Sequence, residues 1–142
     1  MKNYLKTKKS RGEGYVDLCV AVLVLSFVLL LCCASAALIS RGRTIASAAD
    51  RIAEAAALAG RTDLEDAVGR IIADTGLSLT VSFEGTDYLT PGQKVQLGHE
   101  IAVTVRGEGS LPLFLGLSVP VPLEAATVTS SRVYWKGEGD DP

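Results

Sequence analysis

A single acidic side chain stands at the entrance of a long apolar stretch. Asp17 is followed by residues 18–39, which contain no charged side chain, and Gly12 lies five positions before it. A carboxylate drawn into hydrocarbon costs about 2.5–3.5 kcal/mol unless a cation pairs with it. Asp17 therefore either caps the N-terminus of a helix, where its charge suits the helix dipole, or meets a cationic partner.

The element that positions Asp17 is predicted to be a membrane helix. Residues 18–39 would span about 33 Å as a helix, which is enough to cross the ~30 Å hydrocarbon core of a bilayer. Residues 1–17 carry five lysines and arginines against two acids. Such a basic flank favours an N-terminus in the cytoplasm and a C-terminal domain outside.

Charge and cysteine content narrow the functions of the remaining chain. Residues 41–142 carry nine basic and fourteen acidic side chains, which argues against nucleic acid as a partner. All three cysteines, Cys19, Cys32 and Cys33, fall inside the apolar run. The outer part therefore has no disulfide framework and no thiolate metal site. The cysteines are interpreted as small apolar side chains, with lipidation of Cys32 or Cys33 as the alternative.

Two helical patterns follow the apolar run. In residues 44–59, apolar side chains recur at steps of three and four residues, so one helix of roughly 40 residues could continue from the membrane. The stripe consists of Ile45, Ala49, Ile52, Ala56 and Ala59. A second, short amphipathic helix is predicted to follow Gly60. Thr62 and Glu65 would form its capping box, and Gly76 would end it.

The hydrophobic period then changes from 3.6 to 2, which is typical of strands. Strands are predicted over 77–84, at Val95 and Leu97, from His99 to Val105, and over 125–136 with a bulge near Ser130. A type II turn is expected at 90–93 and a loop at 107–110. Three prolines predict that residues 110–123 form an edge segment or a loop. The sequence thus predicts an α+β chain, with a long membrane helix that continues into a small head of helix and antiparallel sheet.

The segment 111–117 is the most apolar part of the outer domain. It contains Leu111, Leu113, Phe114, Leu115 and Leu117. It is expected to cover the domain's core or, if it is exposed, to mark a surface for a partner or a membrane.

No residue set predicts catalysis. The single histidine, His99, is expected to pack in the sheet or lie on its surface, and 107–109 lacks the strand-to-helix setting of a phosphate loop. No cofactor, metal site or enzyme activity is expected.

The opening RGEGYVDLCVAVLVL resembles the class III signal of type IV pilin-like proteins. In that family a basic leader ends in glycine, a prepilin peptidase cuts after it, and an acid stands at the fifth mature position. The resemblance implies a cut between Gly12 and Glu13, with Asp17 fifth; a cut after Gly14 is the alternative. The short TadE-like pilins are the nearest architecture. RGEGYVD, together with VYWK at 133–136, also resembles a family of short single-span proteins associated with Tad-like or conjugative secretion.

The resemblance implies a structural subunit of a surface filament or a secretion or conjugation machine. The domains would be a leader at 1–12, a transmembrane helix at 13–40, an extracytoplasmic domain at 41–136 and a polar tail at 137–142. After cleavage, the new amine of Glu13 would pair with the Asp17 carboxylate of a neighbouring subunit. The partners would be membrane lipid, the peptidase and other pilin-like subunits. The alternative is a binding module that is anchored by an uncut helix, or secreted after cleavage at Ala36 in the A-x-A pattern of 34–36.

Overall fold

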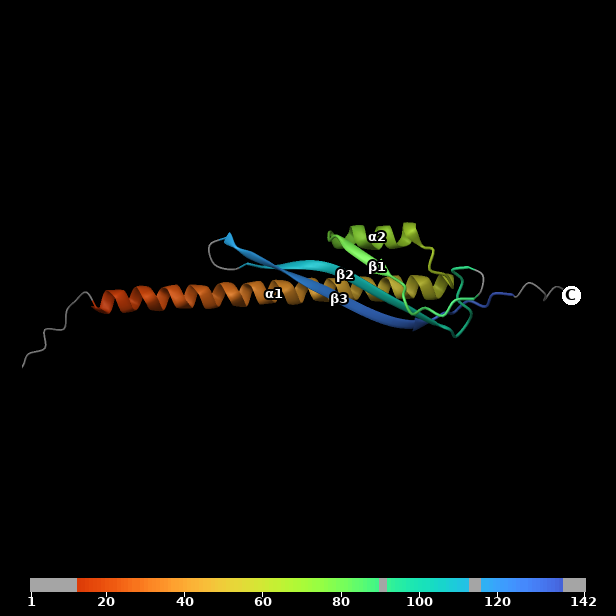
Figure 1. Cartoon of the computed structure of the whole chain (residues 1–142), viewed down its shortest axis with the longest axis horizontal. Coiled ribbons are helices and arrows are strands. Elements are labelled where there is room, and N and C mark those ends of the chain that lie inside the picture. Colours follow the sequence, from red (N-terminus) through yellow and green to blue (C-terminus); the bar gives the residue numbers. More distant parts are fainter. Residues whose placement is uncertain (1–12, 90–91, 113–115, 137–142) are drawn as a thin grey trace, which may run out of the picture. The chain divides into compact units, whose positions relative to one another are not determined.

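The computed structural model describes residues 13–89, 92–112 and 116–136. Two helices are followed by three strands, which confirms the predicted α+β class (Figure 1). The elements are α1 (Glu13–Ala59), α2 (Glu65–Thr75), β1 (Leu79–Ser82), β2 (Glu100–Pro112) and β3 (Ser118–Ser130). Contacts divide the chain into two compact units, Met1–Ala36 and Ala37–Pro142.

Several predicted features lie outside the described residues. They are the leader and its Gly12, Thr90 and Pro91 of the expected turn, Leu113, Phe114 and Leu115, and the tail 137–142.

The first unit consists, in its described part, of the first half of α1. Its large side chains are almost all exposed, including Leu18, Leu25 and Leu29. α1 is long and apolar enough to cross a membrane, so this part is compatible with a single-pass anchor.

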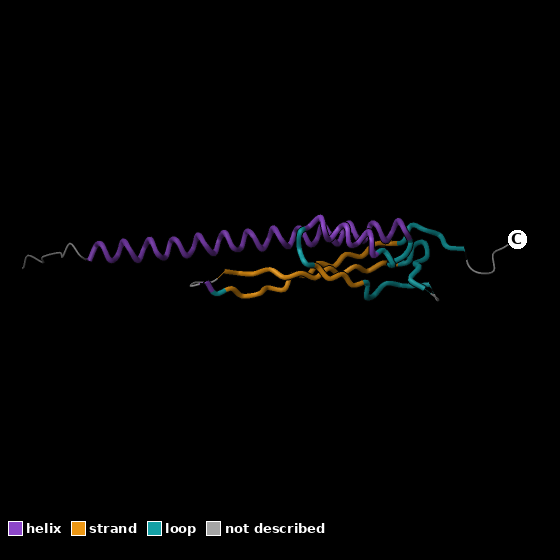
Figure 2. The backbone as a smooth tube through the Cα atoms, turned by 90° about the horizontal axis from the view of Figure 1, so that it is seen from above, coloured by secondary structure: helices purple, strands orange, loops and turns teal. Residues whose placement is uncertain are grey.

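The core of the second unit forms where the later part of α1 packs against the sheet (Figure 2). Ile45 and Ile52 are at most 1% exposed, and alanines of α1 fill the spaces around them. The small alanine side chains allow the helix axis to approach the strands closely. The core comprises Ile45, Ala49, Ile52, Ala53, Ala56 and Ala57 of α1, Val95, and Ile101, Val103 and Val105 of β2. The predicted stripe is therefore confirmed for Ile45, Ala49, Ile52 and Ala56, whereas Ala59 is only partly buried, and the surface that the stripe packs against is the sheet.

The sheet has the order β1-β2-β3, and both pairings are antiparallel. β2 is central and begins at Glu100, one residue after the predicted start at His99. The predicted strand at Val95 and Leu97 is wrong. Val95 is buried, but this segment pairs only through an isolated bridge between Arg61 and Lys94.

Gly107 and Gly109 lie within β2, so the predicted loop at 107–110 is wrong. A Cβ atom at Gly107 would lie 2.7 Å from Leu79 Cδ2 and 3.1 Å from Ile45 Cδ1. At Gly109 it would lie 2.6 Å from Leu38 Cδ2. The two glycines therefore allow α1 to pack closely against the strand, and they do not form a turn.

β3 is an edge strand, which confirms the edge placement predicted for residues 118–123, whereas residues 110–112 of the same predicted segment belong to β2. Pro120 and Pro122 lie two residues apart, so their backbone nitrogens point toward the same edge of the strand. On the edge that has no neighbouring strand, a missing N–H removes no hydrogen bond between strands. The predicted last strand at 125–136 has the wrong bounds. The register runs without a bulge from Pro112↔Ser118 to Glu100↔Ser130, and the strand ends there. The apolar residues shift from an even position at Val128 to an odd position at Val133 because the strand has already ended at Ser130.

α2 confirms the predicted amphipathic helix, and Gly76 ends it with a φ of 65°. The predicted capping box is wrong. The N-cap position is Leu64, without a side-chain cap, and the Thr62 hydroxyl instead lies 3.0 Å from the Tyr88 hydroxyl. A tertiary hydrogen bond has replaced the local one because Thr62 is buried under the chain that follows β1.

Candidate functional site

Asp17, the predicted subunit-pairing acid, lies near the start of α1, and its side chain is exposed. Among the residues that the structure describes, none forms a hydrogen bond or ion pair with Asp17. It is also the only charged residue between Gly14 and Ser40. The helix thus carries an isolated carboxylate at the beginning of an apolar surface, and a cation for it has to come from elsewhere.

The polar side chains inside the apolar run have their hydrogen bonds within α1. Ser26 Oγ donates to the carbonyl of Val22, and Ser35 Oγ donates to the carbonyl of Leu31, each at 2.8 Å. A hydroxyl that is satisfied within its own helix needs no water, which suits hydrocarbon surroundings. Cys19, Cys32 and Cys33 are free and exposed on the same surface.

The VYWK segment at 133–136 covers the C-terminal end of α1. Val133 and Trp135 lie against Gly60, and the Trp135 indole N–H donates to the Gly60 carbonyl at 3.0 Å. The Gln96 side chain accepts from the Trp135 backbone N–H at 2.7 Å and donates to the Trp135 carbonyl at 3.1 Å. The ammonium of Lys94 lies 4.6 Å from the centre of the indole. The sequence indicated this motif but not its role, which is to fasten the C-terminal segment to the helix end.

The side chains of His99 and Asp87 are in contact, and His99 Nδ1 lies 2.8 Å from Asp87 Oδ2. Both side chains are well exposed. This contact could not be predicted from the sequence, because it depends on the fold of the chain between β1 and β2. Its surface placement agrees with one of the two positions predicted for His99.

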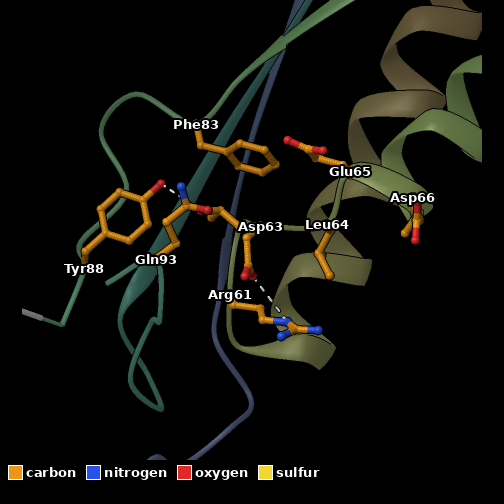
Figure 3. Close-up of a pocket in the computed structure, with 10 residues that line it drawn as sticks. Arg61, Asp63, Leu64, Glu65, Asp66, Phe83, Tyr88 and Gln93 are labelled. Atoms are coloured by element: carbon orange, nitrogen blue, oxygen red, sulfur yellow. Dashed lines mark hydrogen bonds and ion pairs between the residues drawn. The ribbon is translucent and has the colours of Figure 1, made fainter. Parts of the chain in front are cut away.

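A hollow lies beside the start of α2 (Figure 3). Arg61 and Asp63 line one part of it and pair with each other at 3.3 Å, while Phe83 and Tyr88 line it from the chain after β1. Arg61 therefore pairs with one of the three carboxylates that line the hollow, which are those of Asp63, Glu65 and Asp66. Within the described part of the chain, no three histidine, cysteine or acidic side chains are grouped to hold a metal ion.

A comparison with protein families identifies the family of this chain. Residues 22–136 match the family described as Domain of unknown function (DUF4320).

The chain belongs to the DUF4320 family.

The DUF4320 match begins inside the apolar run and ends at Lys136, so it includes most of α1, all of α2, the sheet and the VYWK segment. Gly12 and Asp17 lie before the matched residues. No curated protein and no solved structure matches the chain.

Proposed function

We propose that this DUF4320 protein is a pilin-like structural subunit of a type IV or Tad-like surface filament, or of a secretion or conjugation machine. It is held in the cytoplasmic membrane by α1, with its N-terminus inside and its head outside. A prepilin peptidase removes residues 1–12 and leaves Glu13 as the first residue.

The observation that carries the proposal is the unbroken course of α1. Within the described residues the helix runs without a break from Glu13 to Ala59. Its first part exposes apolar side chains around one isolated acid, and its last part supplies half of the head's core. This is the arrangement expected of a subunit that is both a membrane rod and the support of a globular head.

The proposed chemistry joins neighbouring copies. Cleavage frees the α-amine of Glu13, which pairs with Asp17 of an adjacent subunit when the helices pack together. A buried ion is strongly destabilising without its partner, so the pairing sets the register between subunits.

The position of the division between the two units favours a second candidate. The second unit begins at Ala37, directly after the A-x-A pattern of 34–36, and contains the complete core. A secretory cut after Ala36 would therefore release an intact domain, which would act as a secreted binding module.

The mass of the mature protein distinguishes the two functions. The chain is produced in cells with and without its prepilin peptidase, and intact mass spectrometry is performed on the membrane and soluble fractions. We expect loss of residues 1–12 that depends on the peptidase. A Gly12→Val variant should stay uncut, whereas Gly14→Val should be cut normally.

Loss of residues 1–36 would establish the secreted module instead. A chain that stays whole in the presence of the peptidase would contradict processing and leave a simple membrane anchor. Cutting that Gly14→Val blocks and Gly12→Val permits would move the site to Gly14.

A further inference from the structure

The strongest surface feature that the proposed function leaves unused is the end of the β2–β3 hairpin. Residues 109–123 contain no charged side chain. The sequence favoured residues 111–117 of this stretch as a cover for the core, but the described residues 111, 112, 116 and 117, and the following 118–121, do not belong to the core or pack against it. Leu117 is 66% exposed and Val119 is 45% exposed. Apolar side chains so exposed indicate a surface that meets something other than water.

The hairpin points toward the N-terminal end of the second unit. Along β2, Gly107 packs against Ile45, and Gly109 packs against Leu38, which is seven residues earlier in α1. β2 therefore runs back along the helix. It continues for three residues beyond Gly109, about 10 Å at ~3.3 Å per residue.

This end of the second unit is apolar on the helix as well as on the hairpin. We call it the apolar end; it consists of Leu38, Ile39, Leu111, Leu117 and Val119. Ile39 is 59% exposed and is the last residue of the apolar run, and the chain enters the unit at Ala37, directly from that run. Arg41 and Arg43 follow within four residues, and both are exposed. The change from apolar to cationic along α1 is the change expected where a membrane helix leaves the bilayer through the headgroups.

The backbone of the hairpin is also suited to an apolar medium. The N–H and carbonyl of Ala102 both bond to the Thr86 hydroxyl, so even-numbered residues of β2 direct these groups away from β3. Even-numbered residues of β2 pair with even-numbered residues of β3, so the backbone N–H and carbonyl groups of those β3 residues likewise point away from the partner strand. Pro112, Pro120 and Pro122 occupy such outward positions and have no N–H to leave unpaired. An unpaired N–H in hydrocarbon is costly, so these prolines remove a barrier to lipid contact.

We propose that the apolar end of the second unit docks into the outer leaflet of the membrane that α1 crosses. Leu117 and Val119 enter the acyl-chain region at the headgroup boundary, while Arg41 and Arg43 meet lipid phosphates. The head is thereby held against the bilayer at two points, the helix and the hairpin. Lipid is favoured over a second copy because the surface continues the apolar run and carries no charged side chain that would fix the register of a protein partner.

The docking requires only that α1 crosses a membrane. It therefore holds for a pilin-like subunit and for a plainly anchored domain, and it does not depend on cleavage or on assembly.

Site-directed spin labelling of the full chain in vesicles tests the docking. Cys19, Cys32 and Cys33 are changed to alanine, Leu117→Cys is introduced and labelled with a nitroxide, and the protein is reconstituted in phosphatidylcholine–phosphatidylglycerol vesicles. Collisions of the label with oxygen, which concentrates in hydrocarbon, are compared with collisions with a water-soluble nickel chelate. The matched control is Val128→Cys, an exposed apolar position within β3 at 62% exposure, about 36 Å further along the extended chain.

We expect the label at 117 to gain oxygen collisions and lose nickel collisions relative to the label at 128. Val119→Cys should give the same shift to a smaller extent. Equal nickel exposure at 117 and 128 would overturn the docking. Dipolar broadening between labels at 117 would show that a second copy covers the surface, and it would overturn the docking as well.

Discussion

Gly60 ends α1 at a point where the backbone and the packing both require glycine. Its φ is +63°, and an added Cβ atom would lie 2.6 Å from Val133 Cβ and 2.9 Å from Trp135 Nε1. The residue thus links the end of the helix to the VYWK segment far along the chain. At the residue scale, this is the contact on which closure of the head depends.

We predict that Gly60→Ala destabilises the protein more than Gly76→Ala does. Gly76 has almost the same φ, +65°, but nothing lies within 4 Å of its added Cβ. Both variants bear the left-handed backbone cost of roughly 1–2 kcal/mol. Gly60→Ala adds a clash worth about 1–3 kcal/mol. Urea unfolding monitored by Trp135 fluorescence measures both, and equal losses would show that the VYWK segment does not press on the helix end.

At the scale of elements, α1 has two surfaces of opposite kind. The described part of the first unit leaves its large apolar residues exposed, whereas the second unit buries a stripe of alanine and isoleucine against β2. The small side chains set the distance between helix and sheet, and Gly107 and Gly109 reduce it further from the strand side. The head is therefore built around the helix, and a loss of volume in the stripe should be felt by all three strands.

We predict that Ile52→Ala lowers the free energy of unfolding by about 2–5 kcal/mol, because Ile52 is fully buried and its removal leaves a cavity. The matched control is Leu58→Ala, on the same helix but 58% exposed, which should change stability by less than about 0.5 kcal/mol. Denaturant unfolding of both variants in the same detergent gives the comparison. Similar losses of stability in the two variants would contradict the assignment of Ile52 to the buried face of α1 and of Leu58 to the exposed face.

At the scale of the whole molecule, the proposed function depends on a charge that the single chain leaves unmatched. Asp17 has no partner among the described residues, and the remaining charges of the described chain lie at or beyond Arg41, apart from Glu13. Assembly of several copies would bring the amine and the carboxylate together. The effect of Asp17 should therefore appear in the multimer and not in the stability of the head.

We predict that Asp17→Asn is processed normally but is recovered poorly in the multimer, because it leaves a buried amine unpaired at a cost of about 3–5 kcal/mol. Asp17→Glu keeps the charge and should restore most of the assembly. Cross-linking in membranes, followed by sizing, measures recovery. Asp17→Asn subunits that assemble as well as the unaltered chain would refute the pairing, while an unchanged thermal melt would show that the head is intact in both variants.

The sequence by itself determined the elements whose signals are local. The 22-residue run, the alanine stripe from Ile45 to Ala56, and the amphipathic helix that ends at Gly76 were all predicted, because helix periodicity depends only on neighbours three and four residues apart. The alternation around Ile101 and Val103 similarly predicted β2.

Only the tertiary structure decided the contacts between distant residues. Thr62 bonds to Tyr88 instead of capping α2, and Gly107 and Gly109 admit α1 instead of forming a loop. The VYWK segment closes over Gly60, and Gly109 near the end of β2 lies against Leu38. In each case the local sequence pattern predicted a different structure. The contact that formed instead joins residues far apart in the chain, and only folding brings them within reach of each other.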